Sequence, residues 1–163
     1  MKTVALPARP GTAPVNLKKI LVPSDFSPAS AKAFKYALRF AKQFGAELTL
    51  LHVLEQLSPS FMGITPAPIF SETDLTSIEK NLRALVASAR ATGINQARST
   101  VRRGLASHEI LEVAKELDVD LIVIATHGFT GWKHFCIGST AERVARVAPC
   151  PVLIVREKEH EFV

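Results

Sequence analysis

The sequence predicts a doubly wound α/β domain, in which a parallel β-sheet is covered by helices on both faces. The first observation is a strict alternation of short apolar runs with longer segments of helical periodicity, five strands with four helices. The second is that most of these runs are almost continuously apolar, as in strands buried on both faces. The third is the length of 163 residues, 47% of them hydrophobic, which fits one globular domain.

The first strand and helix are marked by an abrupt change from an apolar run to a helix start. Residues 20–22 are apolar and form the strand. Ser27 is the expected N-cap of the following helix, with Pro28 at the first helical position, where its missing N–H costs nothing. Gly45 ends the helix, and residues 47–54 form the second strand. The buried face of the helix repeats at helical spacing: Phe34, Ala37, Leu38 and Ala41.

Residues 55–70 contain three prolines and a glycine and predict a long flexible loop. A second helix starts near Ser71, whose spacing to Asp74 resembles a capping box, and Gly93 closes it. Its apolar positions follow helical spacing: Leu75, Ile78, Leu82, Leu85, Val86 and Ala89.

The third strand, residues 97–103, is polar, as an edge strand would be. Gly104 turns the chain, and Ser107 is the expected cap of a third helix, with inward-facing Ile110, Leu111, Ala114 and Leu117. Three elements follow: strand 121–125, a short helix at about 139–147 and strand 151–155. Alternation of this kind requires parallel strands with right-handed crossovers. We expect a Rossmann-like sheet with strand order 3-2-1-4-5.

The two ends of the chain lack such patterns. Residues 1–17 are rich in proline and predict a flexible tail, and residues 157–163 predict a charged C-terminal tail. The expected domain therefore spans residues 18–156. No apolar run approaches the roughly 18–20 residues of a membrane helix, and the two cysteines, Cys136 and Cys150, lack metal-ligand or redox spacing. We expect a cytoplasmic protein with reduced thiols and no membrane contact.

The net charge is +5, from 20 Lys and Arg against 15 Asp and Glu. The basic residues form a stripe without interleaved aromatics on the first helix and a group on the edge strand: Lys32, Lys35, Arg39 and Lys42, then Arg98, Arg102 and Arg103. This distribution favours a solvated surface over a nucleic-acid groove.

Ligands of doubly wound sheets bind at the carboxyl ends of the strands, which directs attention to residues 23–27, 52–55 and 125–140. In the last segment a buried strand leads into a loop with glycines that opens a helix, and a helix N-terminus suits a phosphate. Ser139 and Glu142 also fit a capping box, so the serine alternatively serves to cap the helix. Neither a Walker A loop nor a G-x-G-x-x-G fingerprint is present.

These residues resemble the universal stress protein family over about residues 18–156. Four segments carry the resemblance: residues 19–27, 51–53, 120–123 and 148–156. The nucleotide-binding branch of that family has the motif G-x2-G-x9-G-[ST]. The sequence matches it at Gly128, Gly138 and Ser139, with Ala125 in place of the first glycine. We expect the added methyl group to crowd the nucleotide slightly.

The resemblance implies an ATP site, with Mg2+ on the phosphates, in a homodimeric domain. Asp25 would bind the ribose hydroxyls or stand near the phosphates, and Pro23 and Val53 would border the adenine, with Ile124 and Ala125 beside them. The phosphates would be lined by Gly128, Gly138, Ser139 and Thr140. Two simpler interpretations stay open: Asp25 as a turn residue before a helix, and Val53 as core packing.

The histidines give weaker evidence of a functional site than these residues do. His127 could contact a phosphate or act as an acid or base, but with no carboxylate partner evident in the sequence it is interpreted as a hydrogen-bonded spacer. His52, within an apolar strand, is interpreted as structural, and the sequence spacing of His108, His134 and His160 is not that of a metal site.

No paired carboxylates and no nucleophile with a neighbouring base are evident, so we assign no catalytic residue. The function expected is that of an ATP-binding regulatory module of the stress response. The alternatives are a slow ATPase or autophosphorylating protein using the same pocket, and a dimeric signalling module without a nucleotide. Strand 152–155 at a sheet edge is the expected homodimer contact.

Overall fold

The computed structural model describes residues 15–55, 72–126 and 138–156. Its five strands form one parallel sheet in the order β3-β2-β1-β4-β5, which confirms the predicted fold class and strand order. In chain order the elements are β1 Lys19–Pro23, α1 Pro28–Phe44, β2 Glu47–Leu54, α2 Glu72–Ala91, β3 Ala97–Arg103, α3 Ala106–Glu116, β4 Leu121–Ala125, α4 Ser139–Val147 and β5 Val152–Val155.

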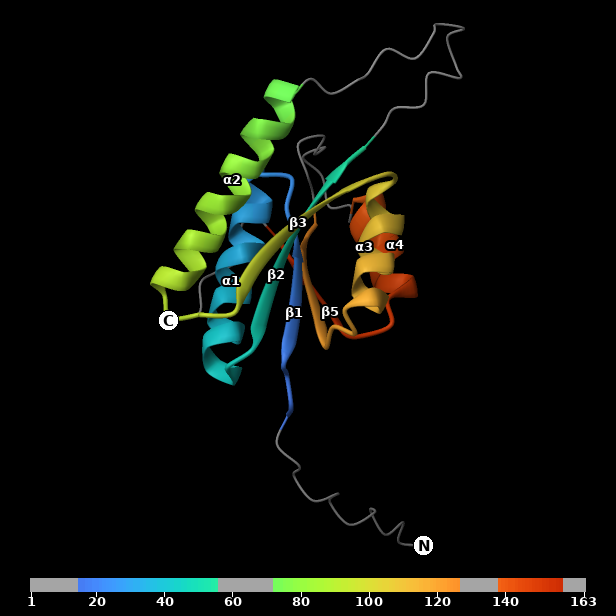
Figure 1. Ribbon diagram of the computed structural model, residues 1–163. Coiled ribbons are helices and arrows are strands. Elements are labelled where there is room, and N and C mark those ends of the chain that lie inside the picture. Colours follow the sequence, from blue (N-terminus) through green and yellow to red (C-terminus); the bar gives the residue numbers. More distant parts are fainter. Residues whose placement is uncertain (1–14, 56–71, 127–137, 157–163) are drawn as a thin grey trace, which may run out of the picture.

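The helices lie on both faces of the sheet, as predicted. In Figure 1, α1 and α2 cover one face, and α3 and α4 cover the other. The winding direction changes at β1, because α1 crosses to β2 on one side and α3 crosses to β4 on the other. Such a change leaves a crevice between the carboxyl ends of β1 and β4.

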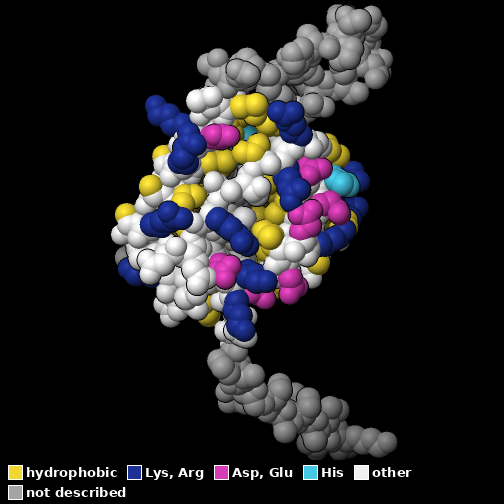
Figure 2. All heavy atoms as spheres, viewed as in Figure 1, with side chains coloured by type: hydrophobic (Ala, Val, Ile, Leu, Met, Phe, Trp, Pro, Cys, Tyr) yellow, Lys and Arg dark blue, Asp and Glu magenta, His cyan; other side chains and the backbone are white. Residues whose placement is uncertain are grey.

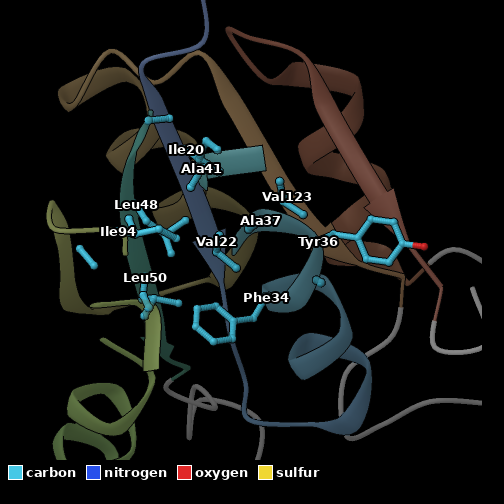
Figure 3. Close-up of a cluster of buried hydrophobic side chains, with 14 of the residues drawn as sticks. Ile20, Val22, Phe34, Tyr36, Ala37, Ala41, Leu48, Leu50, Ile94 and Val123 are labelled. Atoms are coloured by element: carbon cyan, nitrogen blue, oxygen red, sulfur yellow. The ribbon is translucent and has the colours of Figure 1, made fainter. Parts of the chain in front are cut away.

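Side chains of β1, β2, β4 and β5 alternate between two separate cores. Ile20 and Val22 of β1 join the core under α1 and α2, whereas Leu21 joins the core under α3 and α4. Figure 3 shows the first core, to which Leu48 and Leu50 of β2 and Phe34 of α1 all belong, with Leu48 beside Ile94. Burial on both faces explains why the central strands read as continuous apolar runs.

Local signals for the ends of α1 are confirmed. Ser27 is its N-cap and accepts a hydrogen bond from the backbone N–H of Ser30 at 3.2 Å, and Pro28 opens the helix. Gly45 ends it with φ 68°, the left-handed conformation that favours glycine. The prediction for α3 is wrong: the N-cap is Leu105, and Ser107 lies buried inside the first turn. Ser71, proposed as the cap of α2, lies outside the described residues.

The two edge strands of the sheet differ in character: β3 is polar and β5 is apolar. β3 occupies one edge, as expected, and the predicted basic stripe lies on α1, where Lys35, Arg39 and Lys42 are exposed. Figure 2 shows Lys and Arg side chains spread over one face, with Asp and Glu between them. Among the described residues, no helix is long and apolar enough to span a membrane.

Several predicted segments lie outside the described residues. They are most of both tails, the loop after Glu55, and residues 127–137 with Cys136, His127 and His134. The other cysteine, Cys150, is half-buried. Burial, and secondarily the Asp120 carboxylate, raises the pKa of its thiol, which keeps it protonated and unreactive at neutral pH.

Candidate functional site

A cavity of about 480 Å³ opens at the carboxyl ends of the strands. It is lined by three strand ends, the turns after them and residues of four helices. The lining residues from the strands and their turns are Pro23, Ser24, Asp25, Leu51, His52, Val53, Leu54, Glu55, Ile124, Ala125 and Thr126. Those from the helices and the α4 cap are Ser30, Ile78, Ala106, Ile110, Gly138, Ser139, Thr140 and Ala141.

The register of the sheet shapes this cavity. Pro23, the last residue of β1, pairs with Leu51, and β2 continues for three more residues along β3 to Leu54. The extra length of β2 forms a wall beside the shorter β1. Val53 on this wall packs against the core under α3 and α4, so the interpretation of core packing is confirmed, and the residue also forms part of the cavity wall.

The turn between β1 and α1 carries the Asp25 side chain. Ser24 continues the pairing with β2 by donating its N–H to the Leu51 carbonyl at 2.8 Å. Asp25 is half-buried, and its Oδ1 accepts the N–H of Ser27 at 3.0 Å. Asp25 is therefore a turn residue before a helix, as the simpler interpretation expected, and it lines the cavity as well.

His52 stabilises the same turn from β2. Its Nδ1 lies 2.7 Å from the Ser24 carbonyl oxygen, and its ring stacks on Phe26 with a centroid distance of 4.7 Å and an interplanar angle of 21°. The expectation of a structural histidine is confirmed, and the residue also borders the cavity.

The N-terminus of α4 faces the cavity through Gly138, Ser139 and Thr140. Gly138 is the N-cap, and no described side chain caps the helix. The predicted capping box is therefore wrong, because Ser139 is already the first helical residue and Glu142 pairs with Arg146 one turn later. Backbone N–H groups of a first turn and the positive end of the helix dipole suit an anion.

The N-terminus of α3 reaches the cavity at Ala106. Unlike the N-terminus of α4, it is in contact with a carboxylate of the protein. The carboxylate of Glu55, at the end of β2, accepts the N–H of Ala106 at 2.9 Å. The protein's own carboxylate thus occupies the positive end of this helix. Gly104 makes the preceding turn with φ 149°, and its N–H donates to the Leu54 carbonyl at 3.1 Å.

The charged side chains in the described lining are both acidic, Asp25 and Glu55. No lysine or arginine occurs in this described part of the lining. In the ranges that the structure describes, no group of three or more His, Cys, Asp or Glu residues could hold a metal ion by itself.

The structure brings almost all of the predicted site residues together. Eight of them line the one cavity: Pro23, Asp25, Val53, Ile124, Ala125, Gly138, Ser139 and Thr140. Gly128 lies outside the described residues. Sequence reasoning missed Ala106, Ile110 and Ile78, which reach the cavity from the helices α3 and α2. The apolar periodicity of Ile78 and Ile110 predicted buried helix faces, but periodicity does not show which end of a helix meets the strand ends.

Comparison with known proteins places the chain among proteins of one family. A model of the universal stress protein family matches residues 16–156. Universal stress protein MJ0531 of Methanocaldococcus jannaschii is 36% identical over 148 residues, covering 88% of this chain and 85% of that protein. Universal stress protein YxiE of Bacillus subtilis is 36% identical over 145 residues, covering 85% and 98%.

Solved structures show the same fold. Universal stress protein UspA from Lactobacillus plantarum superposes with a TM-score of 0.76 at 25% identity, over 88% of this chain and all of that chain. A universal stress protein in complex with cAMP has a TM-score of 0.67 at 23% identity, over 88% and 99%. The universal stress protein from Archaeoglobus fulgidus in complex with dAMP has a TM-score of 0.64 at 20% identity, over 86% and 98%.

Proposed function

The chain belongs to the universal stress protein family, and on that premise we propose that its cavity binds ATP with Mg2+ and that the protein is a nucleotide-dependent regulatory module in the cytoplasm. The observation that carries the proposal is the pairing, in one cavity, of an apolar wall with a helix N-terminus that no described side chain caps. The apolar wall suits the adenine ring of a nucleotide. The helix N-terminus suits its phosphates. The fold is compatible with such a ligand, since two proteins that share it bind cAMP and dAMP.

The adenine would lie against the apolar wall. Val53 of β2 and Ile124 of β4 line it from the sheet, and Ile110 of α3 lines it from above the sheet face. Pro23 closes the space between β1 and β2. The phosphates would then reach the first turn of α4, where Gly138, Ser139 and Thr140 offer backbone N–H groups and two hydroxyls. Asp25 would accept hydrogen bonds from the ribose hydroxyls.

Charge balance supports a role for Mg2+. The described lining contributes two carboxylates and no cationic side chain, so a nucleotide triphosphate would add several negative charges to an already acidic site. Mg2+ prefers oxygen ligands and commonly binds through substrate phosphates and one or two carboxylates. Asp25 is the carboxylate beside the β1 end that could take part.

A regulatory role fits this lining better than efficient catalysis. Both described carboxylates of the lining accept a backbone hydrogen bond at the start of a helix. Asp25 accepts the N–H of Ser27, the N-cap of α1, and Glu55 accepts the N–H of Ala106, the first residue of α3. Product measured over a long incubation separates the two functions: a robust multiple-turnover rate would contradict the regulatory proposal.

Titration calorimetry of the full chain with ATP tests the binding. We expect a measurable heat with Mg2+ present and an affinity at least about tenfold lower in EDTA, a difference of about 1.4 kcal/mol. Absence of both heat and thermal shift in the presence of Mg2+ would overturn the ATP assignment.

The proposed homodimer rests on the edge strand β5. Val152, Leu153 and Ile154 are only half-buried in the single chain, and Val147 of the preceding helix is 55% exposed. A short apolar edge left bare is an aggregation hazard, and pairing with a second copy covers it. Light scattering at micromolar concentration should give twice the mass of the 17.7 kDa chain; a monomer there would refute the proposal.

A further inference from the structure

Phe26, in the turn between β1 and α1, has φ 64°, a left-handed backbone conformation that bulky residues rarely adopt. Such a conformation costs free energy and persists only where the surrounding structure imposes it. Its neighbour Asp25 is the acidic residue of this turn that lines the cavity. The contacts that hold Phe26 in place therefore also bear on how this carboxylate is presented.

Two of these contacts come from His52, which lies on β2 and is far from the turn in sequence. The His52 ring stacks on Phe26, after Asp25, with centroids 4.7 Å apart. The Nδ1 atom of His52 lies 2.7 Å from the carbonyl oxygen of Ser24, before Asp25. Because a carbonyl oxygen only accepts hydrogen bonds, Nδ1 carries the proton and donates. One side chain thus fixes the residues on both sides of Asp25.

Hydrogen bonds within the turn complete the arrangement. The N–H of Phe26 donates to the Ser24 hydroxyl oxygen at 3.2 Å, and the Ser24 hydroxyl lies 3.3 Å from that of Ser30 in α1. Asp25 accepts the N–H of Ser27, the N-cap of α1. The turn is tied to β2 and to α1, so Asp25 has little freedom to leave the cavity wall.

We propose that His52 is a positioning residue for the nucleotide site: by holding Ser24 and Phe26 it directs the Asp25 carboxylate to the ribose hydroxyls of the ligand. This inference rests on the proposed nucleotide function and deepens it. A histidine that only filled the core would affect stability and all ligands alike. A positioning histidine affects the part of the ligand that Asp25 binds.

The test compares ATP with 2′,3′-dideoxy-ATP, which lacks both ribose hydroxyls. The wild-type protein should bind ATP about tenfold to a hundredfold more tightly, since hydrogen bonds to a charged acceptor are strong. Asp25→Ala should abolish the preference. His52→Phe keeps a ring on Phe26 and removes the Nδ1 donor, and we expect it to lose most of the preference, with no further loss in the double variant.

His52→Asn is the matched control, because its side-chain amide nitrogen can take the place of Nδ1 and donate to Ser24. It should retain more of the preference than His52→Phe. Phe26→Gly is a second route to the same question, since glycine adopts the left-handed φ without a side chain; it should weaken the preference while the protein stays folded. An unchanged preference in His52→Phe, or an equal loss of affinity for both ligands, would overturn the proposal.

A second measurement does not depend on nucleotide binding. In a crystal structure of the unliganded His52→Phe variant we expect Phe26 to leave the left-handed region and the Asp25 carboxylate to move from the cavity wall. An unchanged turn overturns the positioning role even if ATP binds. If the wild-type protein binds neither nucleotide, the proposed function is overturned, and so is the role of Asp25 in binding the ribose. If the turn is nevertheless shifted in the His52→Phe variant, His52 still controls the position of Asp25.

Discussion

Two helices point their N-termini at the same cavity, and they are capped differently. α3 begins at Ala106, whose N–H is taken by the Glu55 carboxylate at 2.9 Å. α4 begins after Gly138, and no described side chain caps it. A helix N-terminus carries about half a positive charge. A carboxylate of the protein neutralises it in α3, whereas no carboxylate among the described residues caps it in α4. The difference indicates that a ligand's anionic end belongs at α4 and its neutral end at α3.

Giving α4 an internal carboxylate should have the largest effect. Gly138 has φ −60° and ψ 148°, which any L-residue can adopt, and aspartate is among the preferred N-cap residues. Gly138→Asp should therefore keep or raise the thermal midpoint while lowering ATP affinity about a hundredfold, or about 2.7 kcal/mol. Calorimetry and thermal unfolding of the same preparation measure the two effects.

Gly138→Asn is the control for this variant. Asparagine has the same shape and caps the helix equally well, but it carries no charge. We expect its loss of ATP affinity to be clearly smaller than that of Gly138→Asp. Equal losses would show that the side chain blocks the site by volume and that the charge of the helix end is not what binds the phosphates.

Removing the carboxylate from α3 should act on stability. Glu55→Gln keeps an oxygen that can accept the N–H of Ala106 but loses the favourable charge at the helix end, worth about 0.3–1 kcal/mol. The thermal midpoint should fall by about 1–4 °C. Glu79→Gln is the control, because Glu79 is exposed and pairs with Arg83 on the surface of α2 at 3.2 Å; its smaller effect follows from screening by water. A larger fall in Glu79→Gln would contradict the comparison.

The smallest effect is expected at the end of β4. Ala125 stands at the position where the resemblance to the nucleotide-binding branch leads us to expect glycine, and it is one of the residues that line the cavity. Ala125→Gly should raise ATP affinity by about twofold to threefold, less than 1 kcal/mol, by removing a methyl group near the nucleotide. Ala106→Gly removes a methyl group at the α3 end of the same cavity, and it should give no gain in affinity. A gain in affinity in Ala106→Gly without one in Ala125→Gly would indicate that the phosphates bind at α3, and it would contradict the proposal that they bind at α4.

The caps of these helices also show where local sequence reasoning succeeds. Ser27 and Pro28 predicted the start of α1 because cap and helix are adjacent in the chain. The assignments of Ser107 and Ser139 as caps were wrong, because each serine already lies within the first turn. For α3 the capping group is Glu55, fifty-one residues away in the chain. No pattern of neighbouring residues contains that information.

In the cavity, too, some features follow from the local sequence and others depend on contacts between distant residues. The rule that ligands bind at the carboxyl ends of parallel strands correctly selected the segments that contain Pro23, Asp25, Val53 and Ala125. It did not find Ile78 or Ala106, which reach the cavity through the packing of α2 and α3. Nor could it find the left-handed backbone of Phe26, since phenylalanine has no intrinsic preference for that conformation and the contact that holds it comes from β2.

The sequence by itself determined the elements, their order and the edge of the sheet where a ligand would bind, because apolar periodicity and chain alternation are local properties with few solutions. Only the tertiary structure decided which helix N-terminus receives a carboxylate from a distant part of the chain, and how Asp25 is held. Those properties depend on contacts between residues distant in the chain, such as Glu55 with Ala106 and His52 with Ser24. They exist only once the sheet has brought its strand ends together.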